Sequence, residues 1–190
     1  MNTYSIIGCG STAKDWIPRG HSIGVNDAWK FGHPTDYLVV VNSPFKFHPR
    51  LDNKYTDRLK VITDSKPKRF FCHNNNWKKW FPEAELLGLR NFVGTYKKGR
   101  IYSSKTSPFV AITLAVREGA TEIILWGIDM TNHHTYSPGK RSFSIEFDYY
   151  KMLFEQLENC GVKVWIGNEN TVLKQILPVY EISQVSRMQP

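Results

Sequence analysis

An alternation of helical and strand patterns in the second half of the chain constrains the fold more than any other feature of the sequence. Residues 107–118 carry apolar side chains at helical spacing, with Ser107 as the expected N-cap and a proline at the first helical position. A strand pattern follows at 121–126, a second amphipathic helix at 147–157, and another strand at 162–166. Strands joined through helices make right-handed crossovers, so this order predicts a parallel sheet.

The first half of the chain adds shorter strand patterns that fit the same sheet. They lie at 3–7, 21–25, 36–41, 59–63 and 69–72. Residues 73–105 are rich in Asn, Lys, Trp and Gly with weak periodicity, and they predict a loop-rich basic and aromatic insertion. A short helix is expected at 169–177. The whole chain, 1–190, is therefore predicted to form one α/β domain with a mostly parallel sheet and helices on both faces.

Length and composition are those of a globular domain. At 190 residues, with 41% hydrophobic and 22% charged residues, the chain can bury a full core without disulfides or metals. The first residues lack a basic segment followed by a long apolar run, and no apolar stretch is long enough to span a bilayer. Cys9, Cys72 and Cys160 lie far apart, without metal-ligand spacing. We therefore expect reduced thiols, a cytoplasmic location and no membrane span.

The formal net charge of +8 leaves open a partner that carries negative charge. Lysines and arginines are concentrated between Lys66 and Arg100, where aromatic residues are interleaved with them. Cations with aromatic rings between them suit a polyanion whose bases or sugars can stack, so a nucleotide, a nucleic acid or an acidic glycan is a candidate. The alternative is a solvated basic surface over an ordinary aromatic core.

A glycine-containing loop directly follows the first strand pattern. Gly8 and Gly10 would let the backbone approach a ligand closely, and Ser11 and Thr12 would offer hydroxyls and helix-start N–H groups to phosphate oxygens. The motif lacks the third glycine of a dinucleotide fingerprint and the Gly-Lys-Ser/Thr of a P-loop. An ordinary strand-to-helix turn is the alternative interpretation.

Asn26 and Asn42 each follow the end of one of the next two predicted strands. In an open parallel sheet ligands bind beyond the carboxyl ends of the strands, so these asparagines and the glycine loop are expected to face one cleft. An amide side chain donates and accepts hydrogen bonds, which suits a ribose, a base or a phosphate. Each asparagine is alternatively a turn residue that tolerates unusual backbone dihedrals.

The second half of the chain contributes two further candidate positions at the same edge. Thr106 and Ser107 begin the predicted helix, where hydroxyls and N–H groups can bind an anion or simply cap the helix. Gly127 and Asp129 follow the strand at 121–126, and the carboxylate can bind a ribose hydroxyl, a metal or a neighbouring loop. No Asp-x-Asp metal motif occurs in the chain, so no obligatory metal or cofactor is expected.

A histidine pair lies in the polar loop after Asp129. His133 or His134 can act as general base toward an acceptor hydroxyl near neutral pH, and Tyr136 can hold a leaving phosphate. We therefore take Asp129, His133 and His134 as the candidate catalytic residues. Exposed histidines without a catalytic role are the alternative.

The segment TSPFVAITLAVREGATEIILWGIDM, residues 106–130, resembles a block of the small bacterial sialyltransferases. In that block Thr-Ser-Gly opens a helix, a glycine ends it, and a strand ending in Gly-Ile-Asp follows at the same spacing. The glycine loop at 8–12, Asn26 and the sequence Asn42-x-Pro44 resemble that family's phosphate loop and its two strand-end asparagines. A related family, assigned by similarity to a pterin pyrophosphokinase, shares the helix and the Gly-x-Asp strand.

The resemblance implies a Rossmann-like transferase, in a GT-A-like variant, that uses a nucleotide-activated sugar as co-substrate. It implies phosphate binding by Gly8, Gly10 and Thr12, and binding of the sugar or base by Asn26, Asn42 and Ser107. The chain departs from the family at four places. Cys9 and Pro108 replace an asparagine and a glycine, Thr131 replaces a tyrosine, and no histidine follows His134.

Glycosyl transfer to a hydroxyl acceptor, either a glycan or a modified nucleic acid, is therefore the leading functional hypothesis. An Mg²⁺-dependent pyrophosphokinase acting on a pterin-like ring is a second one. A nucleotide-binding or nucleic-acid-binding protein that has kept the fold and lost the reaction is a third, and the missing tyrosine and histidine favour it.

Overall fold

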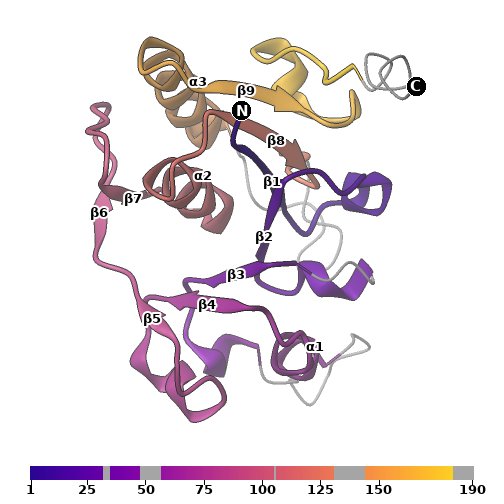
Figure 1. Ribbon diagram of the computed structural model, residues 1–190, viewed down its shortest axis with the longest axis vertical. Coiled ribbons are helices and arrows are strands. Elements are labelled where there is room, and N and C mark those ends of the chain that lie inside the picture. Colours follow the sequence, from indigo (N-terminus) through magenta and orange to yellow (C-terminus); the bar gives the residue numbers. More distant parts are fainter. Residues whose placement is uncertain (32–34, 48–56, 105, 131–143, 182–190) are drawn as a thin grey trace.

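The structure is a computed structural model in which residues 1–31, 35–47, 57–104, 106–130 and 144–181 are described. Its centre is a seven-stranded sheet in which each neighbouring pair of strands is parallel (Figure 1), as the sequence predicts. In spatial order the strands are β5 (Glu85–Leu86), β4 (Arg69–Cys72), β3 (Tyr37–Val40), β2 (His21–Val25), β1 (Thr3–Ile7), β8 (Glu122–Trp126) and β9 (Lys163–Ile166).

The middle of the sheet is buried on both faces, which explains the continuous apolar runs of its strands. Strand β1 lies between β2 and β8, with Tyr4 opposite His21 on one side and Ile123 on the other. All of β8 is buried, including Glu122. The Glu122 carboxylate accepts hydrogen bonds from the hydroxyl of Thr3 at 2.7 Å and from the indole of Trp165 at 3.1 Å. These bonds satisfy a charge that would otherwise be costly to bury.

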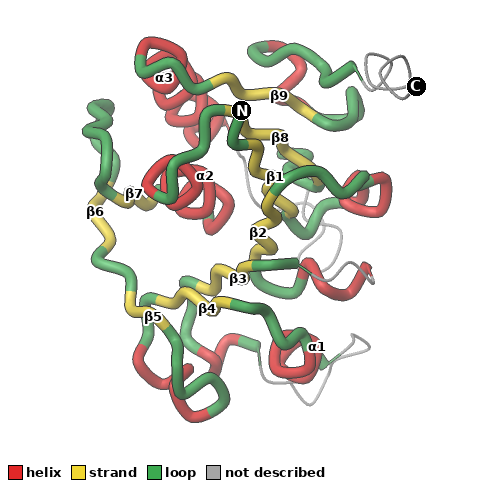
Figure 2. The backbone as a smooth tube through the Cα atoms, viewed as in Figure 1, coloured by secondary structure: helices red, strands yellow, loops and turns green. Residues whose placement is uncertain are grey.

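Two layers of helices enclose the sheet, and Figure 2 shows them on opposite sides of the strands. Helices α2 (Ser107–Arg117) and α3 (Ser144–Asn159) cover one face, where side chains of α2 pack against those of β1, β2 and β3. The other face carries α1 (Arg58–Asp64) and short 3₁₀ helices, among them η1 (Ser11–Asp15) and η2 (Ala28–Phe31). No helix in the described ranges is both long enough and apolar enough to cross a membrane.

Three local expectations were wrong in detail. The segment 59–63 lies inside helix α1 rather than in a strand, because the Asp57 side chain accepts a hydrogen bond from the Lys60 amide at 3.0 Å and caps a helix there. The glycine loop leads into a helix start, as expected, and that helix is the short 3₁₀ helix η1. The N-cap residue of α2 is Thr106, one residue earlier than expected. The helix expected at 169–177 is limited to the 3₁₀ helix η5 (Val172–Gln175).

The region 73–105 is more ordered than the expected loop-rich insertion. It contains the 3₁₀ helix η4 (Asn75–Lys79), strand β5 of the main sheet, and a separate two-stranded parallel sheet. That small sheet is formed by β6 (Leu89–Asn91) and β7 (Ile101–Ser103), and β7 packs on α2.

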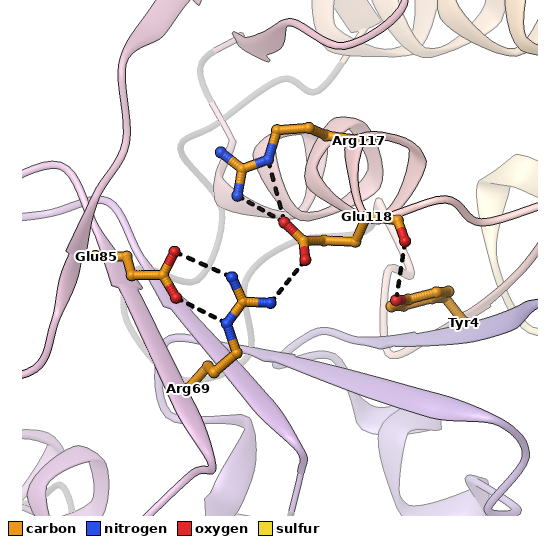
Figure 3. Close-up of polar contacts among 5 residues, drawn as sticks. All are labelled: Tyr4, Arg69, Glu85, Arg117 and Glu118. Atoms are coloured by element: carbon orange, nitrogen blue, oxygen red, sulfur yellow. Dashed lines mark hydrogen bonds and ion pairs between the residues drawn. The ribbon is translucent and has the colours of Figure 1, made fainter.

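An ion-pair cluster, drawn in Figure 3, ties the end of α2 to the amino end of the sheet. Arg69 begins β4, and its guanidinium contacts Glu85 at 2.7 and 3.0 Å and Glu118 at 2.6 Å. Glu118 also accepts a hydrogen bond from Arg117 at 2.7 Å, and its backbone carbonyl accepts one from the Tyr4 hydroxyl at 3.4 Å. The cluster lies at the opposite end of the strands from the predicted site, so we regard it as structural.

Candidate functional site

The predicted site residues lie at the carboxyl end of the sheet. The chain leaves β1 toward β2 on one side, whereas β8 pairs with β1 on the other side, so β1 marks the point where the strand order reverses. Ligands of open α/β sheets bind at such a point. Gly8 and Gly10 follow β1, Asn26 follows β2, Asn42 follows β3, and Gly127 and Asp129 follow β8, while Thr106 and Ser107 begin α2.

The loops after β1 and β8 are joined directly through glycine backbone. The Gly8 amide donates to the Trp126 carbonyl at 2.7 Å, and the Gly10 amide donates to the Gly127 carbonyl at 2.8 Å. A Cβ atom on Gly8 would lie 2.3 Å from the Gly127 carbonyl oxygen, and one on Gly10 would lie 2.5 Å from the Asp129 carboxylate. These two glycines are therefore needed for contact between the loops, a reason that differs from the ligand approach the sequence suggested.

Asp129 holds the glycine loop in place. Its carboxylate accepts hydrogen bonds from the Ser11 hydroxyl at 3.1 Å, from the Thr12 amide at 3.3 Å, and from the Thr12 hydroxyl. The Thr12 hydroxyl in turn accepts from the Gly127 amide at 3.0 Å. Asp129 and Thr12 are both buried, at 5% and 6% exposure. Of the roles considered for Asp129, the structure supports binding of a neighbouring loop, and it directs Thr12 inward to that carboxylate and not toward a phosphate.

Asn26 has a backbone conformation that few residues other than glycine adopt. Its φ is +54°, and its amide donates to the Val39 carbonyl at 3.0 Å, which anchors the turn after β2 to β3. The side-chain oxygen is buried and has no hydrogen-bond partner among the described residues. Buried amide oxygens are normally satisfied, so this atom is the clearest unfilled acceptor at the edge.

Asn42 lies at the same edge, one strand further from β1. Its carbonyl accepts a hydrogen bond from the indole of Trp77 at 2.7 Å, so a residue of the 73–105 region fixes the turn after β3. The Asn42 side chain is half-buried. The parallel register of β1, β2 and β3 brings the glycine loop and both asparagines to one end of the sheet.

A charged group that the sequence analysis did not identify lies beside Asn26. Asp27 is buried and pairs with Arg58 at 2.7 Å and with Lys30 at 3.8 Å, so two cations surround one carboxylate. The Cys9 thiol donates to the Val25 carbonyl at 3.1 Å and to Asp27 at 3.4 Å. Burial, reinforced by the Asp27 carboxylate, raises the pKa of this thiol, so Cys9 is neutral at physiological pH. The sequence could have indicated Asp27 through its position next to Asn26. It could not have indicated Arg58, because the segment that follows Arg58 was wrongly predicted to be a strand.

A second polar network holds the start of α2. The Thr106 and Tyr150 hydroxyls are 2.9 Å apart, and the Ser104 hydroxyl donates to the Glu146 carboxylate at 2.7 Å. Tyr150 and Glu146 are buried on α3. Burial raises the pKa of the Tyr150 phenol, despite its hydrogen bond with Thr106. Thr106 therefore uses its hydroxyl to fix α2 to α3, while the half-buried Ser107 follows as the first helical residue. Sequence spacing on α3 marked Tyr150 only as a core residue.

Three predicted residues lie outside the described part of the chain, namely His133, His134 and Tyr136. Within the described ranges no group of three or more His, Cys, Asp or Glu side chains could hold a metal ion, and the absence of an obligatory metal stays a prediction. A groove of about 540 Å³ lies elsewhere, at the β9 edge, between α3 and the segment after η5. Lys151, Phe154, Trp165 and Pro178 are among its lining residues, and none of the predicted site residues is.

The fold and this edge define a Rossmann-like α/β domain with a parallel central sheet. The chain matches no protein-family model and no curated protein. Among solved structures it is similar to the sialyltransferase CstII from Campylobacter jejuni in complex with cytidine-5'-monophosphate. The TM-score is 0.56 and the identity 16%, with 95% of this chain and 86% of that chain covered.

The monofunctional α-2,3-sialyltransferase Cst-I from Campylobacter jejuni matches with a TM-score of 0.59 and 16% identity, over 94% of this chain and 80% of that chain. CST-II in complex with a trisaccharide acceptor and CMP matches with a TM-score of 0.57 and 14% identity, over 94% and 86%. At these identities the matches show the fold, and they agree with the sialyltransferase-like resemblance of the sequence. The resemblance to a pterin pyrophosphokinase gains no support from them.

Proposed function

We propose that the chain transfers a sugar from a nucleotide-activated donor to a hydroxyl group of an acceptor. The observation that carries this proposal is a fold shared with CMP-bound CstII over 95% of this chain, combined with the gathering of Gly8, Gly10, Asn26 and Asn42 at one end of the sheet. Two of the matched CstII structures contain CMP or the analogue CMP-3FNeuAc, so we propose a CMP-activated sugar as the first donor to test.

Sugar transfer of this kind requires the acceptor oxygen to attack the anomeric carbon while the bond from that carbon to the donor phosphate oxygen breaks. The electron pair leaves with the nucleotide phosphate, and the acceptor proton passes to a base. The N–H groups that begin α2 would favour the departing phosphate. We propose that Asn26 binds the donor through its unfilled side-chain oxygen.

The base and the acceptor belong to the same proposal. We assign the base to His133 or His134, with Tyr136 at the leaving phosphate, on the sequence argument alone. The acceptor class is a glycan hydroxyl, by analogy with the trisaccharide bound to CST-II. No metal is needed for this scheme, so we expect turnover to persist in the presence of EDTA.

The test is release of nucleotide from CMP-, UDP- and GDP-activated sugars, detected by mass spectrometry with and without a glycan acceptor. We expect CMP to be released from a CMP-sugar, and we expect Asn26→Ala to reduce this release more than tenfold. The matched control is Asn159→Ala, because Asn159 is exposed at the end of α3. Binding of nucleotide without any release would show a binding protein, and a response limited to ATP with Mg²⁺ would favour the pyrophosphokinase.

A further inference from the structure

The small sheet and its connecting loop, residues 88–103, form a projection that we call the basic arm. Figure 1 shows it as a narrow extension beside α2 and α3. The arrows of β8 and β9 point away from it. The arm carries four exposed cations, Arg90, Lys97, Lys98 and Arg100. From residue 86 to residue 117 the sequence has no Asp or Glu.

Some cations of the fold are neutralised by carboxylates, and those of the arm are not, in the part of the chain that the structure describes. Arg58, Lys68 and Arg69 each pair with a carboxylate. None of the four arm cations forms an ion pair within the described ranges. Their charge is therefore not neutralised within the described part of the fold, and it can attract an external anion.

The backbone of the arm is held in one conformation. Gln156 of α3 accepts a hydrogen bond from the Tyr96 amide at 2.7 Å and donates one to the Gly94 carbonyl at 3.0 Å. The Lys97 amide donates to the Tyr102 hydroxyl at 3.1 Å. A loop fixed in this way loses little conformational freedom when it binds a partner, which favours binding.

The side chains between the cations narrow the choice of partner. Phe92, Tyr96 and Tyr102 are buried, at 4%, 8% and 6% exposure, so the arm offers none of these rings for stacking on the bases of a single strand. Its exposed large apolar side chain is Val93, which is too little apolar surface for insertion into a lipid bilayer. Exposed cations without accessible rings suit contact with closely spaced phosphates.

We propose that the basic arm binds double-stranded nucleic acid through the phosphate backbone, without reading the base sequence. This surface lies away from the carboxyl edge of the sheet, so the proposal holds whether or not the chain transfers a sugar. It also revises the stacking partner suggested by the sequence, because the aromatic residues Phe92, Tyr96 and Tyr102 of the arm are part of the core.

The test is fluorescence anisotropy with a DNA duplex of about 20 base pairs over a range of salt concentrations, because each phosphate contact contributes about −0.9 to the slope of log K against log salt. The variant is Lys97→Gln with Lys98→Gln. We expect the slope to become shallower by about 2 and binding in about 0.1 M salt to weaken roughly 50-fold. The control is Lys163→Gln with Lys174→Gln, which removes the same charge from exposed sites outside the arm and should leave the slope near the wild-type value.

Three outcomes would overturn the proposal. In the first, the wild-type chain binds no duplex. In the second, the control variant loses as much affinity for the duplex as the arm variant does. In the third, the duplex does not bind, whereas phosphatidylglycerol vesicles bind through the same two lysines. A single-stranded oligonucleotide of the same length serves as a further probe, and a preference for it over the duplex would also contradict the proposal. Circular dichroism of both variants verifies that the fold is retained.

Discussion

At the scale of single residues, the glycines of the first loop are explained by a neighbour rather than by a ligand. The Asp129 carboxylate occupies the space where a side chain on Gly10 would lie, at 2.5 Å from the position of a Cβ atom. That carboxylate also holds Ser11 and Thr12, so a shift of either loop disturbs both. A glycine motif of this kind can therefore serve the packing of two loops and still lie at the edge of the sheet that carries the candidate site.

We predict that Gly10→Ala destabilises the fold by about 1–3 kcal/mol, because the added methyl group must displace the buried Asp129 carboxylate. Urea unfolding followed by circular dichroism measures the change. The matched control is Gly88→Ala, since a Cβ atom there meets nothing within 4 Å, and it should change the stability by less than about 0.5 kcal/mol. Equal effects of the two substitutions would rule out the packing explanation for Gly10.

At the scale of elements, α2 is fixed at both ends by polar groups from other parts of the chain. Its first turn is tied to α3 through Thr106 and Tyr150. Its last turn is tied to β4 through Glu118 and Arg69. The helix therefore connects the candidate site at one end of the sheet with the ion-pair cluster at the other, and each end can be tested separately.

The Glu118 end predicts a pH dependence of stability. Burial alone would raise the pKa of the Glu118 carboxyl, but the hydrogen bonds and charges of Arg69 and Arg117 lower it overall. A carboxyl whose pKa is lower in the folded state stabilises the fold above its unfolded pKa, about 4.3 for glutamate, and the contribution is lost as the pH falls through the folded value. We expect Glu118→Gln to be less stable than wild type in urea at pH 7, with the difference shrinking below about pH 4. Glu83→Gln, an exposed carboxyl with no ion pair in the described ranges, should show no such trend.

The Thr106 end predicts an effect on nucleotide binding. Tyr150→Phe keeps the buried ring and removes the hydroxyl that contacts Thr106, at a cost of about 1 kcal/mol. If the first turn of α2 contributes to the donor site, the Kd for CMP should rise about 3- to 10-fold, as measured by isothermal titration calorimetry. Tyr149→Phe is the control, because Tyr149 packs against the core and its hydroxyl forms no hydrogen bond within the described ranges. If the Kd for CMP is unchanged in Tyr150→Phe, the first turn of α2 does not contribute to the donor site.

At the scale of the whole molecule, the sequence predicts the order of elements better than the contacts among them. Long periodic patterns gave α2, β8, α3 and β9, because the spacing of apolar residues reports burial directly. The short run at 59–63 fits a strand or a helix equally, and the capping by Asp57 decides it. The strand-end asparagines were predicted from their positions alone. The network around Asp27 was not, because Arg58 meets it across 31 positions in the chain. Contacts over such separations leave no local pattern to recognise.

The candidate site draws on both halves of the chain, and this arrangement leads to a prediction for the unfolding of the whole domain. The glycine loop, Asn26 and Asn42 come from the first quarter, whereas Ser107 and the loop that holds Gly10 come from beyond residue 100. A ligand that spans them binds only when the complete sheet is assembled, so CMP should raise the midpoint of a single cooperative transition. At a concentration of about 100 times Kd the gain is about 2.7 kcal/mol, or roughly 5–10 °C for a domain of this size. Differential scanning calorimetry measures the shift, and Asn26→Ala should reduce it while Asn159→Ala should not. A shift confined to one of two separate transitions would mean that the nucleotide binds to part of the fold, and the shared edge of the sheet would then not be the site.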